Sequence, residues 1–135
     1  MADKIQLEVV TPERRVLGED VDMVTVPGLN GEMGILPGHT PLISQLKTGV
    51  LTYTQDSRNT QLLVSGGFVE VRDDHVAVLA VVAERPEEID ASSARATRDR
   101  LEKQLGAWTG SEQELELART ELARSEVRLQ LAAKA

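Results

Sequence analysis

The sequence contains no cysteine and almost no aromatic residues, and each absence excludes a class of function. Without cysteine there are no disulfide bonds and no thiolate metal site. One Trp, one Tyr and one Phe occur in 135 residues, so the core must consist of aliphatic side chains. The same scarcity argues against a protein that stacks nucleic-acid bases on exposed aromatic rings.

A surplus of positive charge and long hydrophobic runs are also missing. The formal net charge is -7, whereas a surface that neutralises phosphates needs surplus lysine and arginine, so we expect no nucleic-acid partner. No stretch approaches the roughly 18 apolar residues of a membrane-spanning helix. The start, "MADKIQLEVV", has no basic region followed by an apolar run, so we expect no export signal. These features predict an intracellular protein that reaches a membrane only through a partner.

The first part of the chain, through about residue 84, has the pattern of β-strands. Apolar residues occupy alternate positions at Ile5, Leu7 and Val9, and later runs such as "GVLTY" and "QLLV" are bounded by turn residues. Asn30-Gly31 is the strongest turn signal and predicts a two-residue hairpin loop. Many short strands with no helix between them predict a β-sandwich or barrel.

After "AERPEEID" the period changes to that of helices. Pro86 ends the last strand, and Asp90 is the predicted N-cap of a first helix. Ser111 and Glu114 form the pattern of a capping box at the start of a second helix. One narrow apolar stripe follows that second helix, at Leu115, Ala118, Leu122, Ser125, Leu129 and Ala132. We therefore predict a β domain over residues 1–86 and an antiparallel two-helix hairpin over residues 87–135.

No catalytic motif is evident. The only histidines, His39 and His75, are too far apart for a helical metal-ligand pair, and no G-x-S-x-G occurs. The glycines of "GEMGILPGHT" are not a phosphate-binding P-loop, because no lysine follows the last one. Asp73, Asp74 and Glu84 lie at turns or strand ends, where carboxylates are usually solvated. A small enzyme that uses His39 or His75 stays as a minor alternative.

The stretch "GEMGILPGHTPLI" is rich in residues that shape the backbone. Gly31, Gly34 and Gly38 permit positive φ or close approach, whereas Pro37 and Pro41 fix φ. From these residues alone, two interpretations stay open. The stretch is either a hairpin with bends at a sandwich edge, or a stiff loop that presses on a partner.

Longer motifs resemble a known family. "VVTPERRVLGEDVDMVTVPGLNGEMGILPGHTPLI", "VSGGFVEVRDDHVAVLA" and "AERPEEIDASSARA" are similar to the epsilon subunit of F-type ATP synthase, and the resemblance covers essentially the whole chain. It implies a mainly β plus α fold, a flattened β-sandwich of about ten strands followed by the helical hairpin. It also implies a non-catalytic central-stalk subunit that couples c-ring rotation, driven by the proton gradient, to ATP synthesis. The C-terminal helices would inhibit ATP hydrolysis.

The resemblance also implies partners and contact residues. The partners would be the gamma subunit, the c-ring and the catalytic beta subunits, on the cytoplasmic face of a bacterial plasma membrane or the stromal or cytoplasmic face of a thylakoid. Arg119, Arg124 and Arg128 would meet an acidic segment of a catalytic subunit, although an ordinary solvated helix face is equally compatible with them. The side that faces gamma and the c-ring would be formed by Gly31, Glu32, Met33, Gly34, Pro37, Gly38 and His39.

Some members of this family bind ATP at the hairpin through I-D-x-x-R-A and a preceding glutamate. Glu84, Ile89, Asp90 and Ala94 match this motif, but Ser93 occupies the position of the arginine. A neutral hydroxyl cannot replace a bidentate guanidinium toward phosphate. Glu84 and Asp90 are therefore only candidate nucleotide contacts, and we expect no cofactor.

An adaptor is the alternative from another functional class. A free-standing β-sandwich could bind helical partners through the leucine stripe of its hairpin. Co-purification with a gamma-like partner and a membrane sector separates the two hypotheses.

Overall fold

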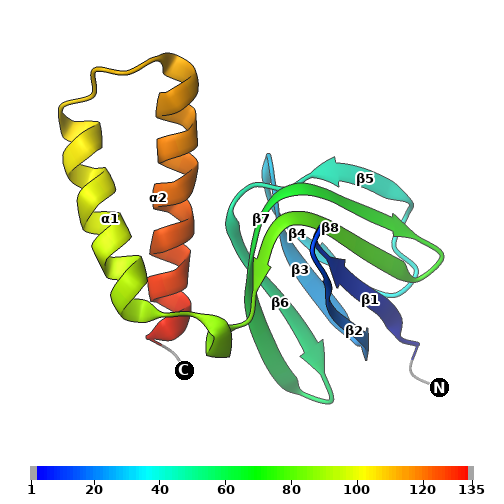
Figure 1. Cartoon of the computed structure of the whole chain (residues 1–135). Helices are drawn as coiled ribbons and strands as arrows, with labels where there is room; N and C mark the ends of the chain where they lie inside the picture. Colours follow the sequence, from blue (N-terminus) through cyan, green and yellow to red (C-terminus); the bar gives the residue numbers. More distant parts are fainter. Residues whose placement is uncertain (1–2, 134–135) are drawn as a thin grey trace.

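The computed structural model describes residues 3–133, as a β-sandwich followed by two helices (Figure 1). The strands are β1 (Ile5–Val10), β2 (Arg15–Val21), β3 (Met23–Gly28), β4 (Gly31–Ile35), β5 (Leu42–Gln45), β6 (Gly49–Gln55), β7 (Arg58–Arg72) and β8 (His75–Glu84). The 3₁₀-helix η1 (Pro86–Glu88) precedes the helices α1 (Ala91–Gly106) and α2 (Glu112–Ala132). The predicted fold class is confirmed, and the described residues form eight strands rather than about ten.

β7 accounts for part of the lower strand count. The sequence suggests two short runs on either side of Gly66-Gly67, whereas β7 continues through both glycines for 15 residues. Both have positive φ, +71° and +92°, so the strand bends there without ending. Its first half pairs with β6 and its second half with β5, while β8 pairs with it from Leu63 to Arg72.

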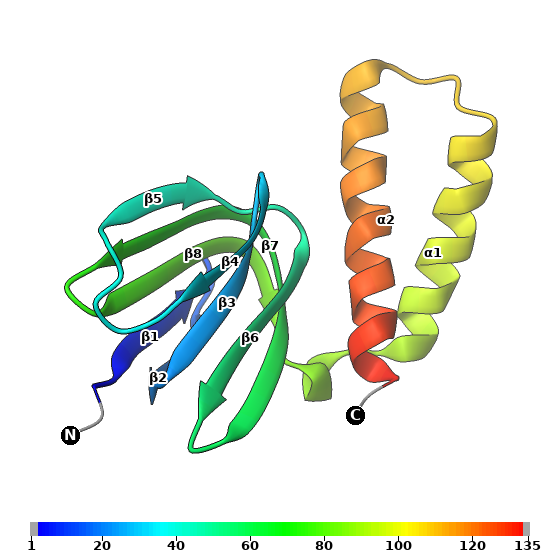
Figure 2. The same cartoon turned by 180° about the vertical axis from the view of Figure 1, so that it is seen from behind.

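The bend lets one sheet close over a single core. The strand order is β2-β1-β8-β7-β6-β3-β4, with β5 attached to β7, and the sheet folds over itself (Figures 1 and 2). The β1–β8 pair is parallel and the other strand pairs are antiparallel. Ile5, Leu7 and Val9 lie in the core, as their alternation predicts. Burial of each such aliphatic side chain contributes about 1.5–3 kcal/mol to folding.

The predicted hairpin at Asn30-Gly31 exists, but its loop begins one residue earlier. Gly28 pairs with Gly31, so the two loop residues are Leu29 and Asn30. Gly31 already belongs to β4 and has a φ of +133°. The Asn-Gly signal therefore located the reversal of the chain but not the strand register.

Both predicted helix caps are present. The Asp90 side chain accepts a hydrogen bond from the Ser93 backbone N–H (3.1 Å). The Ser111 hydroxyl accepts one from the Glu114 N–H (3.1 Å) and donates to the Glu114 carboxylate (3.0 Å). These bonds satisfy N–H groups that the first helical turn leaves without partners.

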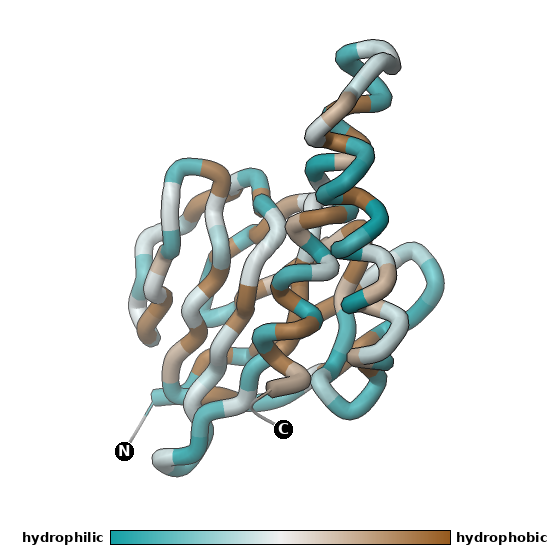
Figure 3. The backbone as a smooth tube through the Cα atoms, turned by 90° about the vertical axis from the view of Figure 1, so that its left-hand side faces the viewer, coloured by the Kyte–Doolittle hydropathy of each residue, from teal (hydrophilic) through white to brown (hydrophobic). Residues whose placement is uncertain are grey.

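The two helices form the predicted antiparallel hairpin, and α2 lies between α1 and the sandwich (Figures 1 and 2). All six positions of the predicted stripe on α2 are buried or half-buried. Leu131 is also buried, although it lies outside that stripe, and Leu117 is 72% exposed. The tip of the hairpin projects beyond the sandwich (Figure 3).

Two features concern the organisation of the chain. Within residues 3–133, no helix combines the length and the apolar character needed to cross a bilayer. The predicted domain boundary between residues 86 and 87 falls inside η1. The division into two domains stays a prediction.

The bend in β7 generates a test with a matched control. A Cβ at Gly67 would overlap the carbonyl oxygen of Leu79, whereas a Cβ at Gly38, where φ is also positive, meets nothing within 4 Å. We expect Gly38→Ala to lower the free energy of unfolding by about 1–2 kcal/mol through backbone strain. Gly67→Ala adds a steric term and should cost about 2–5 kcal/mol. Urea denaturation of both variants measures the difference. Equal losses in the free energy of unfolding would contradict the close packing of Gly67 against Leu79.

Candidate functional site

The loop after β4 is held in place by its own backbone and by the turn between β7 and β8. The Gly38 N–H donates to the Asp74 carboxylate at 2.7 Å, across 36 residues of sequence. The His39 N–H donates to the Leu36 carbonyl at 3.1 Å, and the His39 ring Nδ1 lies 2.7 Å from the Thr40 carbonyl oxygen. His39 is thus engaged by its own loop, which does not suggest a proton carrier.

The structure brings the predicted partner-contact residues together on β4 and this loop. The exposed members are Glu32, Gly34 and Gly38, and the half-buried ones are Gly31, Met33, Pro37 and His39. Met33 also packs against the core. Leu29 and Leu36, 55% and 57% exposed, flank the same stretch. Leu36 lies within the stretch predicted to face a partner, whereas Leu29 precedes it. Sequence reasoning singled out neither leucine, because apolar character alone does not show which leucine faces outward.

Arg128 ties α2 to the last strand of the sandwich. Its Nε and Nη2 donate to the two carboxylate oxygens of Glu84, each at 2.9 Å. Its Nη1 donates to Glu121 on the same helix at 3.2 Å. These hydrogen bonds, with Glu84 the largest contributor, raise the pKa of Arg128 above its ordinary value. Both arms of the guanidinium are therefore occupied while the hairpin lies against the sheet.

Arg124 makes a second contact between α2 and the sheet. Its Nε donates to the Ser65 hydroxyl at 2.8 Å, and that hydroxyl lies 2.7 Å from the Thr48 hydroxyl. Ser65 is fully buried. The sequence predicted only the neighbouring contact with Glu121, which the structure confirms at 3.6 Å. Nothing in the sequence pointed to Ser65, which lies 59 residues away.

Arg119 does not belong to this group. It is exposed and pairs with Glu116 one turn earlier on α2, at 3.0 Å. The three arginines predicted to act together therefore divide in the structure. Arg124 and Arg128 contact the sheet, whereas Arg119 points to solvent.

The segment that joins the sandwich to the helices is pinned to the edge of the sheet. Arg14 pairs with Glu88 of η1 at 2.7 Å, and Arg85 donates to the Val16 carbonyl at 2.8 Å. The Arg85 N–H also donates to Glu88, at 2.9 Å. The hydrogen bond from Arg14, followed by that N–H, lowers the pKa of Glu88. These contacts attach the chain to the sandwich as far as Glu88.

Glu84 and Asp90, the candidate nucleotide contacts, line one small hollow of about 180 Å³. Glu88 and Ser93 line it too, so three carboxylates face this space. Its one guanidinium, that of Arg128, is already bound to Glu84. Ser93 adds no positive charge, so the lining offers no free guanidinium to pair with phosphate. These residues do not fit tight ATP binding.

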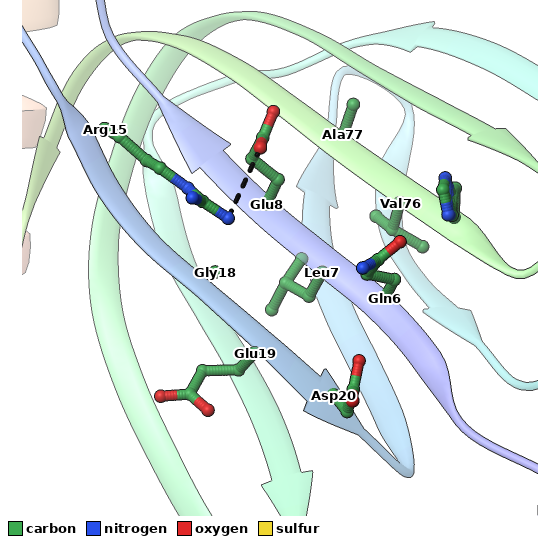
Figure 4. Close-up of a pocket in the computed structure, with 10 residues that line it drawn as sticks. Gln6, Leu7, Glu8, Arg15, Gly18, Glu19, Asp20, Val76 and Ala77 are labelled. Atoms are coloured by element: carbon green, nitrogen blue, oxygen red, sulfur yellow. Dashed lines mark ion pairs between the residues drawn. The ribbon is translucent and has the colours of Figure 1, made fainter.

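A larger hollow of about 540 Å³ lies over β1, β2 and β8 (Figure 4). Glu8 pairs with Arg15 across it at 3.5 Å, and Arg15 lies over Gly18. His75 lines this hollow, whose lining includes no serine, threonine or cysteine. Among residues 3–133, no three His, Asp or Glu side chains are placed so that together they could hold a metal ion. The alternative of an enzyme that uses His75 thus gains no support from this geometry.

Comparison with known proteins identifies relatives over the whole chain. Residues 4–86 match the family model described as ATP synthase, Delta/Epsilon chain, beta-sandwich domain. The ATP synthase epsilon chain of Geotalea uraniireducens is 41% identical over 135 residues, 100% of this chain and 98% of its own length. That of Pelotomaculum thermopropionicum is 49% identical over 110 residues, 81% and 82% of the two chains.

Two solved structures have similar folds. A chain in the Euglena gracilis mitochondrial ATP synthase, OSCP/F1/c-ring, superposes with a TM-score of 0.80 at 27% identity, over 96% of this chain and 81% of that one. A chain in the Tetrahymena thermophila mitochondrial ATP synthase, central stalk and c-ring, has a TM-score of 0.66 at 17% identity, over 96% and 97%. The second likeness concerns the fold alone.

The Arg14–Glu88 pair predicts a specific pH dependence. Because the pKa of Glu88 is lower in the folded chain, the pair contributes stability above the ordinary glutamate pKa of about 4.3 and loses it as the pH falls through the lower folded value. We expect Glu88→Gln to be less stable than the native chain near neutral pH, by about 1 kcal/mol or less. The difference should close as the pH falls below about 4. Urea denaturation over a pH series tests this, and a difference that persists in acid would assign the effect to packing.

The lining of the small hollow predicts the response to nucleotide. We expect Mg-ATP to bind the native chain with a Kd weaker than about 1 mM. Ser93→Arg adds a guanidinium that can pair with phosphate and should tighten binding about tenfold or more. Titration calorimetry of both proteins tests this. Saturable heat at micromolar ATP with the native chain would refute it.

Proposed function

Since the chain belongs to the epsilon-chain family of ATP synthase, we propose that it works as a non-catalytic subunit of the central stalk. There it couples rotation of the c-ring, driven by the proton gradient, to ATP synthesis. The observation that carries this proposal is 41% identity to an ATP synthase epsilon chain over the full length of both proteins. The likeness to a chain in an F1/c-ring assembly supports it.

The proposed partners are the gamma subunit, the c-ring and the catalytic beta subunits. The complex would lie on the cytoplasmic face of a bacterial plasma membrane, or on the stromal or cytoplasmic face of a thylakoid. The β4 loop supports a contact with gamma and the c-ring, because a loop already ordered by the Asp74–Gly38 bond loses little conformational entropy on docking.

A second surface supports a protein partner. Apolar side chains on β5, β7 and β8 are exposed: Ile43 is 70% exposed, Phe68 48%, Leu79 52% and Val81 54%. Phe68 and Leu79 are direct cross-strand neighbours, so the apolar side chains are contiguous there. Contiguous apolar surface on a folded chain is typical of an interaction site.

The hairpin is the proposed regulatory element, which inhibits ATP hydrolysis when it extends toward the catalytic subunits. α1 has 16 residues and α2 has 21. At 1.5 Å per residue, the released helices would reach about 55 Å end to end. Arg119, Arg124 and Arg128 would then meet an acidic segment of a catalytic subunit.

The clamp on the β4 loop provides the test of the docking surface. Asp74→Gly removes the acceptor for the Gly38 N–H but tolerates the positive φ of +60° at that position. Asp73→Gly is the matched control, because it changes the same turn and leaves the bond to Gly38 in place. We expect the Asp74 variant to bind epsilon-depleted ATP synthase about three- to tenfold more weakly, since the loop must be ordered on binding.

The measurement is titration of each variant into the depleted complex, with recovery of proton-coupled ATP synthesis as the readout. At saturating concentration both variants should restore synthesis, because neither residue performs chemistry. Equal affinities of the two variants would refute the role of loop order. A native chain that restores no coupling would refute the proposed function itself.

A further inference from the structure

The contacts that hold α2 against the sheet use the same arginines that the proposed inhibitory contact requires. In the docked hairpin Arg128 is bound to Glu84 and Glu121, and Arg124 to Ser65. We propose that Glu84 is an intramolecular competitor, which holds Arg128 on the sandwich and withholds it from acidic groups of a partner. This inference deepens the proposed regulatory function and rests on it.

The geometry makes Glu84 the decisive member of the group. It is the last residue of β8, so it stays with the sandwich, and it lies 44 residues from Arg128 in the sequence. Glu121 is on α2 and moves with the arginine. Undocking therefore breaks the bidentate pair with Glu84 but leaves the contact with Glu121. A fork-to-carboxylate pair is both stronger and more directional than a single charged contact.

Most apolar side chains of α2 are only half-buried, so polar contacts contribute to its docking alongside them. Only Ser125 and Leu131 are fully buried among the described residues of α2. The Ser125 hydroxyl has no hydrogen-bond partner in the described structure, so its burial adds no polar stabilisation to the hairpin. Loss of one ion pair should therefore shift the balance between the docked and released hairpin.

The burial of the Arg128–Glu84 pair indicates that it contributes to the stability of the docked hairpin. The Arg128 and Glu84 side chains are 20% and 27% exposed, whereas the Arg119 and Glu116 side chains are 60% and 70% exposed. Solvent-exposed pairs are screened by salt and contribute little. Arg119 and Glu116 both lie on α2, so loss of their ion pair should not change how α2 docks on the sheet. Arg119 is the matched control for Arg128.

The first measurement uses the full chain alone. Because the chain has no cysteine, cysteines introduced at the exposed Glu13 and Thr109 can be labelled uniquely for distance measurements between the sandwich and the hairpin tip. We expect Glu84→Gln, and separately Arg128→Ala, to shift the ratio of docked to released chains about tenfold toward release. Arg119→Ala should leave the distance distribution unchanged. An unchanged distribution in Glu84→Gln would overturn the proposal.

The second measurement separates the competitor from the contact. In ATP synthase reconstituted with the chain, Glu84→Gln should increase inhibition of ATP hydrolysis because it frees Arg128. Arg128→Ala should relieve inhibition, and the double variant should behave like Arg128→Ala. Hydrolysis rates equal to those of the native chain for Glu84→Gln, with an increased released population, would overturn the competition. A failure of the proposed regulatory function would give a different result, because the native chain itself would then not inhibit ATP hydrolysis.

Discussion

The long antiparallel pairing of β7 and β8 is the constraint on which the rest of the structure depends. β7 runs for 15 residues and bends at Gly66-Gly67, so it serves both halves of the sandwich. The register places Leu63 opposite Glu84, and Ser65 two residues further along. The two groups that receive the arginines of α2 are therefore positioned by one strand pair. The turn that ends this pair carries Asp74, which clamps the β4 loop.

These connections link the two surfaces that the proposed function needs. At one end of β7 and β8, the turn orders a loop suited to a lasting contact. Toward the other end, the strands present a carboxylate and a hydroxyl that hold a helix mainly by polar bonds. The first arrangement resists movement, whereas the second permits it, because few side chains of α2 itself are fully buried. A stalk subunit that transmits rotation and also carries a releasable hairpin requires both properties.

Local patterns predicted the elements well, and the reason lies in the range of the interactions involved. Strand alternation at Ile5, Leu7 and Val9, and the caps at Asp90 and Ser111, depend on residues within a few positions of one another. The predictions of the number of strands and of the loop residues in the Asn30-Gly31 hairpin were less accurate. Glycine signals a change of backbone direction, but it does not state whether the strand ends or bends.

The sequence by itself determined the class of the fold, the helical hairpin, the absence of thiol chemistry and, through its long motifs, the family. Only the tertiary structure decided which side chains meet. The Arg128–Glu84 and Arg124–Ser65 contacts join residues 44 and 59 positions apart, and the same structure leaves Arg119 in solvent. Helical periodicity places Arg124 and Arg128 about 40° apart on one face of α2, and Arg119 about 140–180° away from them. It contains no information on which face the sheet will engage, because that depends on how two separately formed layers pack.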